Sequence, residues 1–162
     1  MARKVENKAP AVRRARPDDA QRLAELSGQL GYPAGAAGIK RILRKLKTSA
    51  HSAVFVAQSP NGGVVGWVQV SMTHILEFGT RAELDGVIVD EAHRSLGAGA
   101  KLLEAAEAWA RKQGCLSMSV RSNVIRERAH KFYERQGYEH YKTQKAFRKP
   151  LESPARRPPI TP

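Results

Sequence analysis

The chain has 162 residues, which at about 100 to 200 residues per domain predicts one compact domain, and its 41% hydrophobic and 27% charged residues exclude wholesale disorder and the fibrous classes. Charge is the unusual quantity, because 28 Lys and Arg against 15 Asp and Glu give a formal net charge of +13. This surplus favours an anionic partner, such as nucleic acid, a phosphate or a nucleotide cofactor, although a soluble, self-repelling surface also explains it.

The domain is predicted to lie between two flexible arms. Residues 1–10 are polar and charged, and residues 152–162 are rich in proline, which few folded elements tolerate. We therefore expect a basic arm, a single domain over 11–151 and a proline-rich tail.

The first part of the domain is predicted to contain one strand and two helices. A strand is expected over 11–16, followed by a helix that Asp18 caps, with Gln21 completing a capping box. Gly31 is predicted to end this helix. A second, strongly basic helix is indicated by apolar residues at i, i+3, i+4 and i+7, which are Ile39, Ile42, Leu43 and Leu46.

The middle of the domain is predicted to be a hairpin followed by a β-α-β unit. The runs 53–58 and 64–72 are rich in β-branched residues, and the sequence Ser-Pro-Asn-Gly-Gly between them is typical of a hairpin. A strand over 82–89, an alanine- and leucine-rich helix over 98–113 and a strand over 116–121 follow. We expect the two outer strands of this unit to be parallel and the crossover to be right-handed.

The last elements are predicted to be a helix over 126–136 and one or two strands within 138–143 and 145–149. The resulting order of strands and helices predicts an α/β (α+β) fold. No apolar run approaches the ~18 residues of a membrane helix, and the amino terminus lacks the apolar stretch of a secretory signal. We therefore expect a cytoplasmic protein that is not in a membrane.

Cysteine and histidine usage predicts no metal site. The lone Cys115 excludes an intramolecular disulfide framework and any cysteine-rich zinc site, and we expect it to pack without a chemical role. The histidines are scattered without metal-ligand spacing. They are His51, His74, His93, His130 and His140.

The most informative stretch is the segment 82–103, in which a strand leads into a long helix. Between them the sequence Arg94-Ser95-Leu96-Gly97-Ala98-Gly99 places glycines at a helix N-terminus, where free amides and the macrodipole favour a phosphate group. A Rossmann fingerprint lacks its third glycine, because position 102 is Leu, and no Gly-Lys-Ser/Thr of a P-loop follows. The remaining pattern R-x-x-G-x-G is weak alone, since a tight helix start also explains the glycines.

A second motif follows about thirty residues later and reads Ala129-His130-Lys131-Phe132-Tyr133-Glu134-Arg135-Gln136-Gly137-Tyr138. In this order and separation the two motifs resemble the GNAT superfamily of acetyl-CoA-dependent N-acetyltransferases, whose cofactor loop is R/Q-x-x-G-x-G/A and whose later helix ends in A-x-x-F/L-Y-E-x-x-G-F/Y. The resemblance covers residues 11–151. It implies a GNAT-like fold, with a central mixed sheet of six to seven strands flanked by about four helices.

The resemblance also implies residues that bind acetyl-CoA. The strand before the turn pairs its backbone with the pantetheine arm, which corresponds to Val87, Ile88 and Val89. The amides of the turn bind the pyrophosphate, which corresponds to Arg94, Ser95, Leu96, Gly97, Ala98, Gly99 and Ala100. Family members commonly have Asn seven positions before the motif tyrosine, where this chain has Arg126, so Asn123 is the candidate to make that contact instead.

Acetyl transfer to an amine requires a proton acceptor, because an alkyl amine of pKa about 10.4 is neutral at pH 7 only on the order of one part in a thousand. Glu83 and Asp85 alternate with Val87 and Val89 and are expected on the same face of the strand. Either carboxylate is the candidate base, directly or through water; the alternative is that both only orient a cationic acceptor. The resemblance implies that Tyr133 protonates the leaving thiolate, and its alternative role is that of a half-buried core tyrosine.

Local charge favours a cationic acceptor. No acidic residue occurs between Leu26 and Leu76, whereas residues 77–91 hold five acids and one arginine, a local net charge of −4. Such a stretch beside the reaction centre would attract a polyamine, an aminoglycoside, or a lysine or amino-terminal peptide amine, although a solvated loop also explains it. The sequences Ser27-Gly28-Gln29-Leu30-Gly31-Tyr32-Pro33 and Arg121-Ser122-Asn123 are similar to a branch likened to aminoglycoside 6'-N-acetyltransferases.

The expected function is therefore transfer of the acetyl group of acetyl-CoA to a primary amine by direct attack in a ternary complex. Two alternatives stay open. One is a basic nucleic-acid-binding module, motivated by the basic second helix, although interleaved aromatic residues and a recognition-helix pattern are missing. The other is a catalytically silent GNAT scaffold that binds coenzyme A. Dimers are frequent in families of this kind, which makes a homodimer one assembly to test.

Overall fold

The computed structural model describes residues 9–151. The expected arm over 1–10, apart from its last two residues, and the expected tail over 152–162 lie outside the described residues. The chain divides into two compact units, of which the first ends at Asn123 and the second begins at Val124. No helix in the described range is both long and apolar enough to cross a membrane.

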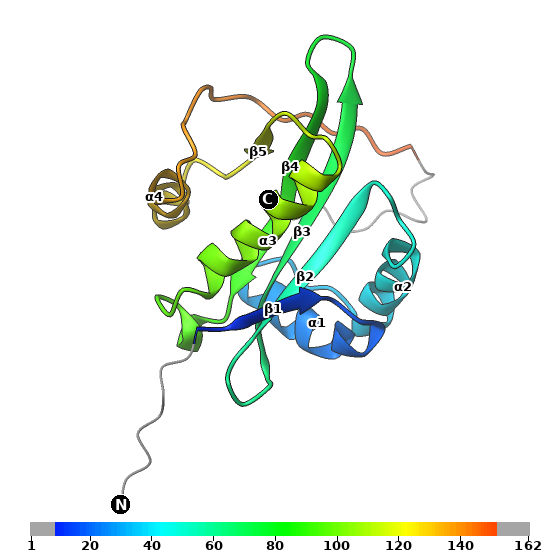
Figure 1. Ribbon diagram of the computed structural model, residues 1–162, viewed down its shortest axis with the longest axis vertical. Helices are drawn as coiled ribbons and strands as arrows, with labels where there is room; N and C mark the ends of the chain where they lie inside the picture. The colour runs from blue at the N-terminus through cyan, green and yellow to red at the C-terminus, as the bar shows by residue number, and fades with distance from the viewer. Residues whose placement is uncertain (1–8, 152–162) are drawn as a thin grey trace, which may run out of the picture. The chain divides into compact units, whose positions relative to one another are not determined.

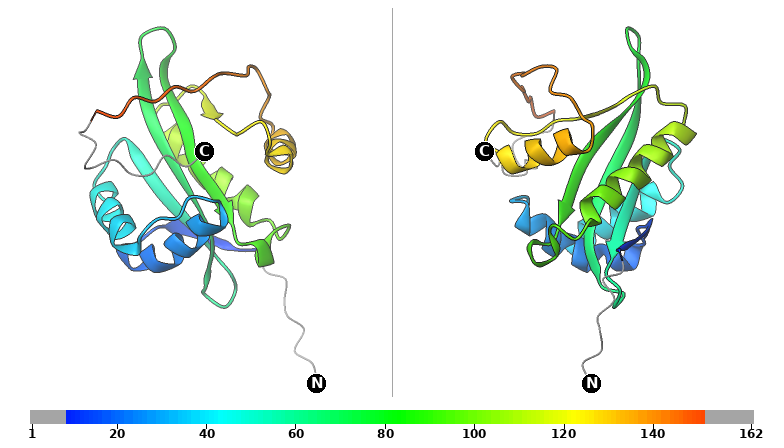
Figure 2. Two further views of the ribbon diagram at one scale, coloured as in Figure 1. Left: turned by 180° about the vertical axis from the view of Figure 1, so that it is seen from behind. Right: turned by 60° about the vertical axis from the view of Figure 1, so that its left-hand side comes forward.

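The first unit is built around a five-stranded mixed sheet (Figure 1). Its strands are β1 (Ala11–Arg14), β2 (Ser52–Gln58), β3 (Val64–Ile75), β4 (Gly79–Val89) and β5 (Met118–Val120). They lie side by side in chain order, with antiparallel pairing from β1 to β4 and parallel pairing between β4 and β5. The parallel pair confirms the predicted β-α-β unit, and β3 and β4 form a long hairpin that extends past the other strands (Figure 2).

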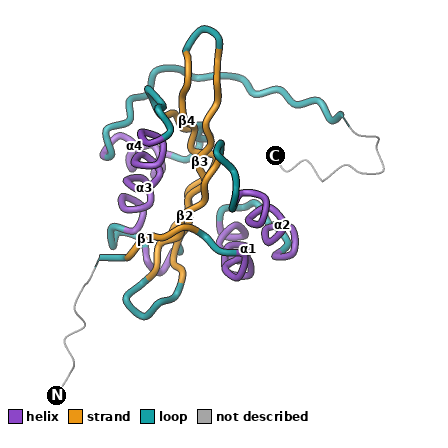
Figure 3. Tube along the Cα trace, turned by 45° about the vertical axis from the view of Figure 1, so that its right-hand side comes forward, coloured by secondary structure: helices purple, strands orange, loops and turns teal. Residues whose placement is uncertain are grey.

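Helices cover both faces of this sheet. Helices α1 (Ala20–Gln29) and α2 (Ala36–Leu46) lie on one face, and α3 (Ala98–Lys112) lies on the other (Figure 3). Helices α1 and α3 bury apolar residues that their sequences space three or four apart, such as Leu23 and Leu26 of α1, or Leu102, Leu103 and Ala106 of α3. Helix α2 buries Leu43, whereas Ile42, expected on the same apolar face, is exposed. Burying each such leucine stabilises the fold by roughly 1.5 to 3 kcal/mol.

The two apolar layers meet at β3. On one face, Trp67 packs against the cluster of Ala20, Leu23, Leu43, Val54 and Val56. On the other face, Gly66 lies against both β4 and α3, where a Cβ atom would lie 2.7 Å from the carbonyl oxygen of Ile88 and 3.2 Å from a methyl group of Leu102. Only glycine allows the helix to pack at this distance.

The start of α1 differs from the prediction in its capping residue. A single 3-10 turn over Pro17–Asp19 precedes the helix, and Asp19, not Asp18, accepts a 2.7 Å hydrogen bond from the backbone N–H of Arg16. Asp19 also accepts two 2.8 Å hydrogen bonds from the guanidinium of Arg13 on β1. The predicted helix is present, but the carboxylate that bonds to the backbone at its start is that of Asp19, which also pairs with Arg13, six residues earlier on β1.

The second unit contains α4 (Glu127–Arg135), followed by residues 138–151 without regular structure. The strands expected within 138–143 and 145–149 are therefore wrong, and the sheet has five strands within the described residues instead of six to seven. Every residue from 139 to 151 is exposed, and most are polar or charged. A strand here would bury little apolar surface on either face, and burial against neighbouring strands is what stabilises a strand.

Candidate active site

The most informative feature of β4 is a β-bulge at Asp85. Gln69 of β3 pairs with Gly86, and the next residue, Val70, pairs with Leu84, so Asp85 is an extra residue without a partner in the ladder. Bulges bend a strand and re-aim one side chain, and they are common beside active sites. The bulge thus frees the Asp85 side chain, in the middle of a strand, from the regular alternation of faces.

The bulge changes which residues of β4 share a face. Glu83 lies opposite Ser71 and Val87 lies opposite Val68, and these two β3 residues are three apart and so point to opposite faces. Glu83 therefore does not share a face with Val87 and Val89, contrary to the sequence-based expectation. Period-two counting failed because it cannot detect an inserted residue.

Asp85 remains beside Glu83, because Ser71 Oγ donates a 2.9 Å hydrogen bond to Asp85 Oδ1. Partial burial raises the pKa of Asp85, and the negative charge of Glu83 raises it further, while hydrogen bonds from Ser71 and Gln69 and the charge of Arg121 oppose the rise without cancelling it. A carboxylate with a raised pKa accepts a proton from a bound amine more readily than an ordinary aspartate does.

Glu83 has a different environment. It forms an ion pair with Arg121, which directly follows β5; the Glu83 side chain is 16% exposed and the Arg121 side chain 84% exposed. The two candidate bases suggested by the sequence are thus brought together by the fold. They differ in that Glu83 has a cationic partner and Asp85 has neutral hydrogen-bond donors.

The outer edge of β4 is open beyond the bulge. Strand β5 pairs only with Ala82, Glu83 and Leu84, and no strand within residues 9–151 pairs with the outer edge of the segment 85–89. An unpaired strand edge offers N–H and C=O groups to an extended ligand. Val87, Ile88 and Val89, the residues expected to contact a pantetheine arm, lie in this segment.

The loop after β4 is held to α1 by Asp90. Its carboxylate pairs with the guanidinium of Arg22 and accepts a 3.2 Å hydrogen bond from the side-chain amide of Gln29. Gln29 in turn accepts a 3.3 Å hydrogen bond from the backbone N–H of Glu91. These residues, which sequence reasoning missed as part of the site, fix the position from which the turn into α3 begins.

The start of α3 lacks a capping side chain. Gly97 is its N-cap with φ of +83°, Ser95 has φ of +67°, and no acidic residue lies in the first turn. Left-handed backbone at position 97 favours glycine, which explains the first glycine of the motif. The amides of the first turn and the helix dipole therefore remain available to an anion. Arg94 and the residues up to Ala100, which were expected to bind the pyrophosphate, lie before and in this first turn.

The remaining two candidates lie near or beyond the boundary of the units. Asn123 is exposed and is the last residue of the first unit. Tyr133 lies on α4 in the second unit, with its ring centroid 5.4 Å from that of Phe132 and 5.9 Å from that of Tyr138. Burial raises the pKa of the Tyr133 hydroxyl, against a smaller opposing effect of Arg126, so the phenol is protonated at neutral pH.

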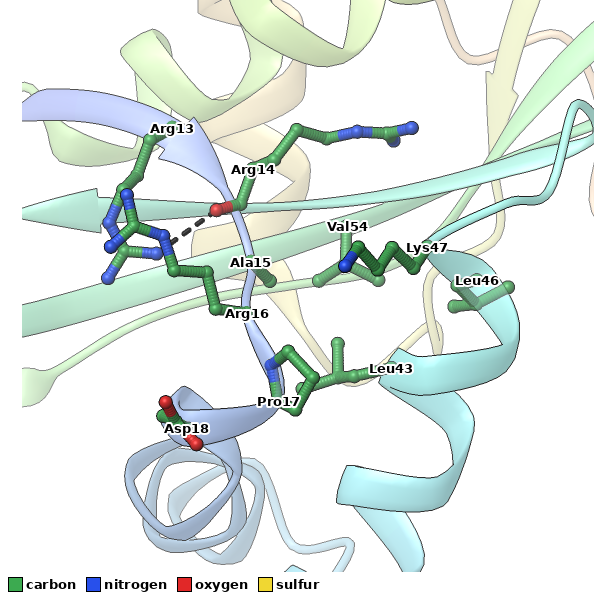
Figure 4. Close-up of a pocket in the computed structure, with 10 residues that line it drawn as sticks. All are labelled: Arg13, Arg14, Ala15, Arg16, Pro17, Asp18, Leu43, Leu46, Lys47 and Val54. Carbon is green, nitrogen blue, oxygen red and sulfur yellow. Dashed lines mark hydrogen bonds between the residues drawn. The ribbon is translucent and has the colours of Figure 1, made fainter.

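A hollow of about 590 Å³ lies elsewhere in the first unit, between β1, α2 and β2 (Figure 4). Apolar side chains line part of it, among them Leu43, Leu46 and Val54, and Arg13, Arg14, Arg16 and Lys47 lie around it. None of the residues that line it belongs to the candidate active site. Within the described residues, no group of three or more His, Cys, Asp or Glu side chains is arranged to hold a metal ion.

Comparison with known proteins identifies the family. The sequence model of the Acetyltransferase (GNAT) family matches residues 18–138. The chain belongs to this family. This GNAT chain is 33% identical over 152 residues to an aminoglycoside N(6')-acetyltransferase type 1 from Stenotrophomonas maltophilia, a match that covers 91% of the chain and 97% of that relative. It is thus an enzyme of the N-acetyltransferase class.

Two further similarities bear on the fold and the range of relatives. The GNAT chain is 34% identical over 90 residues to an aminoalkylphosphonate N-acetyltransferase from Salmonella typhimurium, covering 54% of this chain and 58% of that one. The fold matches that of AAC(6')-Iy solved with the bisubstrate analogue CoA-S-monomethyl-acetylneamine, with a TM-score of 0.78, 19% identity, and coverage of 89% of this chain and 100% of that chain. The predicted α/β GNAT fold is confirmed.

Proposed function

We propose that this GNAT enzyme transfers the acetyl group of acetyl-CoA to a primary amine of a small cationic acceptor by direct attack in a ternary complex. The observation that carries the proposal is the bulge at Asp85. It places a carboxylate of raised pKa beside Glu83, at the point where β4 loses its outer partner. The residues that follow lead to the uncapped start of α3.

The cofactor part of the proposal rests on two backbone features. No strand within residues 9–151 pairs with the outer edge of Val87, Ile88 and Val89, so their backbone can pair with an extended chain, and the first-turn amides of α3 can bind a pyrophosphate. Bound acetyl-CoA would supply the activated thioester. The solved neighbour with a coenzyme A analogue supports this use of the fold.

The acceptor part of the proposal assigns the proton transfers. Asp85 accepts a proton from the ammonium group, directly or through water, and the neutral amine nitrogen then attacks the thioester carbonyl. A C–N bond forms, the C–S bond breaks, and Tyr133 donates its phenolic proton to the departing thiolate. The nitrogen then gives up its second proton, directly or through water, to the Tyr133 phenolate, which leaves a neutral amide, a thiol and the original phenol. The role of Tyr133 comes from the family resemblance, and its protonated phenol is consistent with it.

The acceptor class is proposed to be a compact molecule with several amines, such as an aminoglycoside. The relative that covers almost the whole chain is named for aminoglycosides. A pair of carboxylates in the site favours cationic groups, whereas the anionic phosphonate of an aminoalkylphosphonate would be repelled by Glu83 and Asp85. The acceptors to be tested therefore include both polycationic amines and an aminoalkylphosphonate.

The proposal is tested in two steps. Calorimetric titration should detect acetyl-CoA binding, and absence of binding at roughly 100 µM would contradict the proposed function. Thiol release is then measured with an aminoglycoside, spermidine, a lysine peptide and an aminoalkylphosphonate; we expect the aminoglycoside or the polyamine to give the highest kcat/KM. In Tyr133→Phe, kcat should fall more than acetyl-CoA affinity, because the hydroxyl acts on the leaving group.

A further inference from the structure

The ion pair between Glu83 and Arg121 is asymmetric in its exposure. The carboxylate is enclosed, with 16% of the Glu83 side chain exposed, whereas 84% of the Arg121 side chain is exposed. An enclosed carboxylate needs a counter charge, because an unpaired buried charge is strongly destabilising. An exposed arginine gains little from the same pair, since solvent already surrounds it. Glu83 therefore requires a cation, but Arg121 is readily exchanged for another one.

The other groups on this face leave Arg121 as the partner of Glu83. Arg81, two residues earlier on β4, has its guanidinium 5.6 Å from the centre of the Phe78 ring. Asp85 is the bulged residue, and the neutral side chains of Ser71 and Gln69 on β3 donate hydrogen bonds to it. Glu83 is thus compensated by an exposed cation, and Asp85 has neutral hydrogen-bond donors.

We propose that Arg121 is a specificity-determining residue of the acceptor site, an internal cation that holds Glu83 in the free enzyme and that a cationic group of the acceptor displaces. This inference rests on the proposed function and deepens it. Displacement needs little rearrangement, because the guanidinium moves into solvent that it already contacts. Displacing Arg121, however, loses the attraction between Arg121 and Glu83. This loss weakens the binding of every acceptor that replaces Arg121.

The exchange selects for acceptors with at least two amines. The reacting ammonium gives its proton to Asp85 and becomes neutral, so it cannot also balance the charge of Glu83. A second ammonium on the same molecule can replace Arg121. A monoamine leaves Arg121 paired and gains nothing from Glu83. Arg121 thus works as a competitor that only a multiply charged acceptor overcomes.

The experiment compares Arg121→Met with wild type on 1,4-diaminobutane and on butylamine, a diamine and a monoamine of the same chain length. We expect Arg121→Met to lower KM for the diamine about fivefold, with a smaller change in KM for the monoamine. Arg121→Lys, which retains the cation, should restore the wild-type KM. Arg111→Met is the matched control, because Arg111 is 72% exposed and pairs with Glu107 on α3, away from the site.

Two outcomes overturn the inference. One is an unchanged or higher KM for the diamine in Arg121→Met, and the other is an equal fall in Arg111→Met, which would indicate a general effect of net charge. Calorimetric binding of the diamine to wild type and Arg121→Met decides the exchange without turnover. Wild-type enzyme that releases no thiol with any amine contradicts the proposed function, whereas active enzyme with an unaltered diamine KM in Arg121→Met contradicts this inference alone.

Carboxyl-carbon NMR of Asp85 distinguishes an electrostatic role of Arg121 from a merely structural one, because a structural role would not shift the Asp85 titration. Arg121 lowers the pKa of Asp85, so its replacement by methionine should shift the Asp85 titration to higher pH. Arg121→Lys should leave the titration close to that of wild type. An unshifted Asp85 titration in Arg121→Met would show that Arg121 does not act on this site.

Discussion

Asp19 and Asp85 lie in the same unit but have opposite electrostatic surroundings. Burial of Asp19 opposes ionisation, yet its hydrogen bonds from Arg13 and the Arg16 amide hold its pKa below the usual value. Burial of Asp85 raises its pKa, and its bond from the neutral Ser71 offsets this only in part. The fold pairs Asp19, which contributes to stability, with a cation. It leaves Asp85 in an environment that favours accepting a proton.

The sharpest way to test this contrast is Asp85→Asn. We expect kcat/KM to fall by about 10² to 10⁴, because the asparagine amide cannot accept the ammonium proton. Because the folded pKa of Asp85 is raised, its ionisation destabilises the fold at neutral pH, so Tm should stay level or rise. Asp18→Asn is the control, since the Asp18 side chain is 94% exposed. A fall in kcat/KM below tenfold would remove Asp85 as the base.

Asp19→Asn should have the opposite profile. Loss of the charged partner leaves the partly buried Arg13 uncompensated, and we expect a decrease in the free energy of unfolding of about 1 to 3 kcal/mol. For a chain of this size each kcal/mol corresponds to a fall in Tm of about 2 to 4 °C. Thermal melts and thiol release at the same temperature measure both effects; a variant with wild-type Tm and reduced kcat would reverse the roles assigned to the two aspartates.

The two pKa shifts predict separate acid limits. The stabilisation from Asp19 is complete above its unfolded pKa of about 3.9 and is lost as pH falls through its lowered folded pKa. The acid limb of kcat/KM reports the raised pKa of Asp85 and so lies above that of an ordinary aspartate. On acidification, activity should therefore be lost before stability. Coincident transitions in one buffer series would mean that unfolding causes the loss of activity.

The smallest expected effect concerns Ser71→Ala. Its hydroxyl lowers the pKa of Asp85, so its removal should move the acid limb of kcat/KM to higher pH and reduce kcat/KM on that limb about threefold. At higher pH the variant should match wild type. Ser71→Thr, which keeps the hydroxyl, is the control. A uniform loss at all pH values would indicate disturbed packing at the bulge instead of an altered titration.

The sequence predicted those parts of the molecule that depend on local pattern. The helix over 98–112, its glycine start at Gly97 and the parallel strands around it follow from periodicity and backbone preference, and the two motifs led to the correct family. The bulge at Asp85 depends on cross-strand register, which no local pattern records. The partners Arg121 and Asp90 lie 38 residues and 68 residues from Glu83 and Arg22 in the chain, so only the fold could pair them.

The prediction of C-terminal strands was wrong for a related reason. One or two strands were expected within 138–143 and 145–149, but a strand is stabilised by the backbone and side chains of its neighbours. Charged and exposed side chains such as Lys142 and Lys145 offer little surface to bury. The family resemblance implied a sheet of six to seven strands, whereas the described residues form a sheet of five.

The unpaired edge of the segment 85–89 also bears on the behaviour of the enzyme during storage and expression. A bare strand edge is a template on which a second chain can add, which is the first step of many aggregation reactions. The kink at Asp85 and the short length of the edge limit this risk. If coenzyme A pairs there as proposed, its presence should raise Tm by mass action and also keep the protein monodisperse at high concentration, so the cofactor would serve as a practical stabiliser.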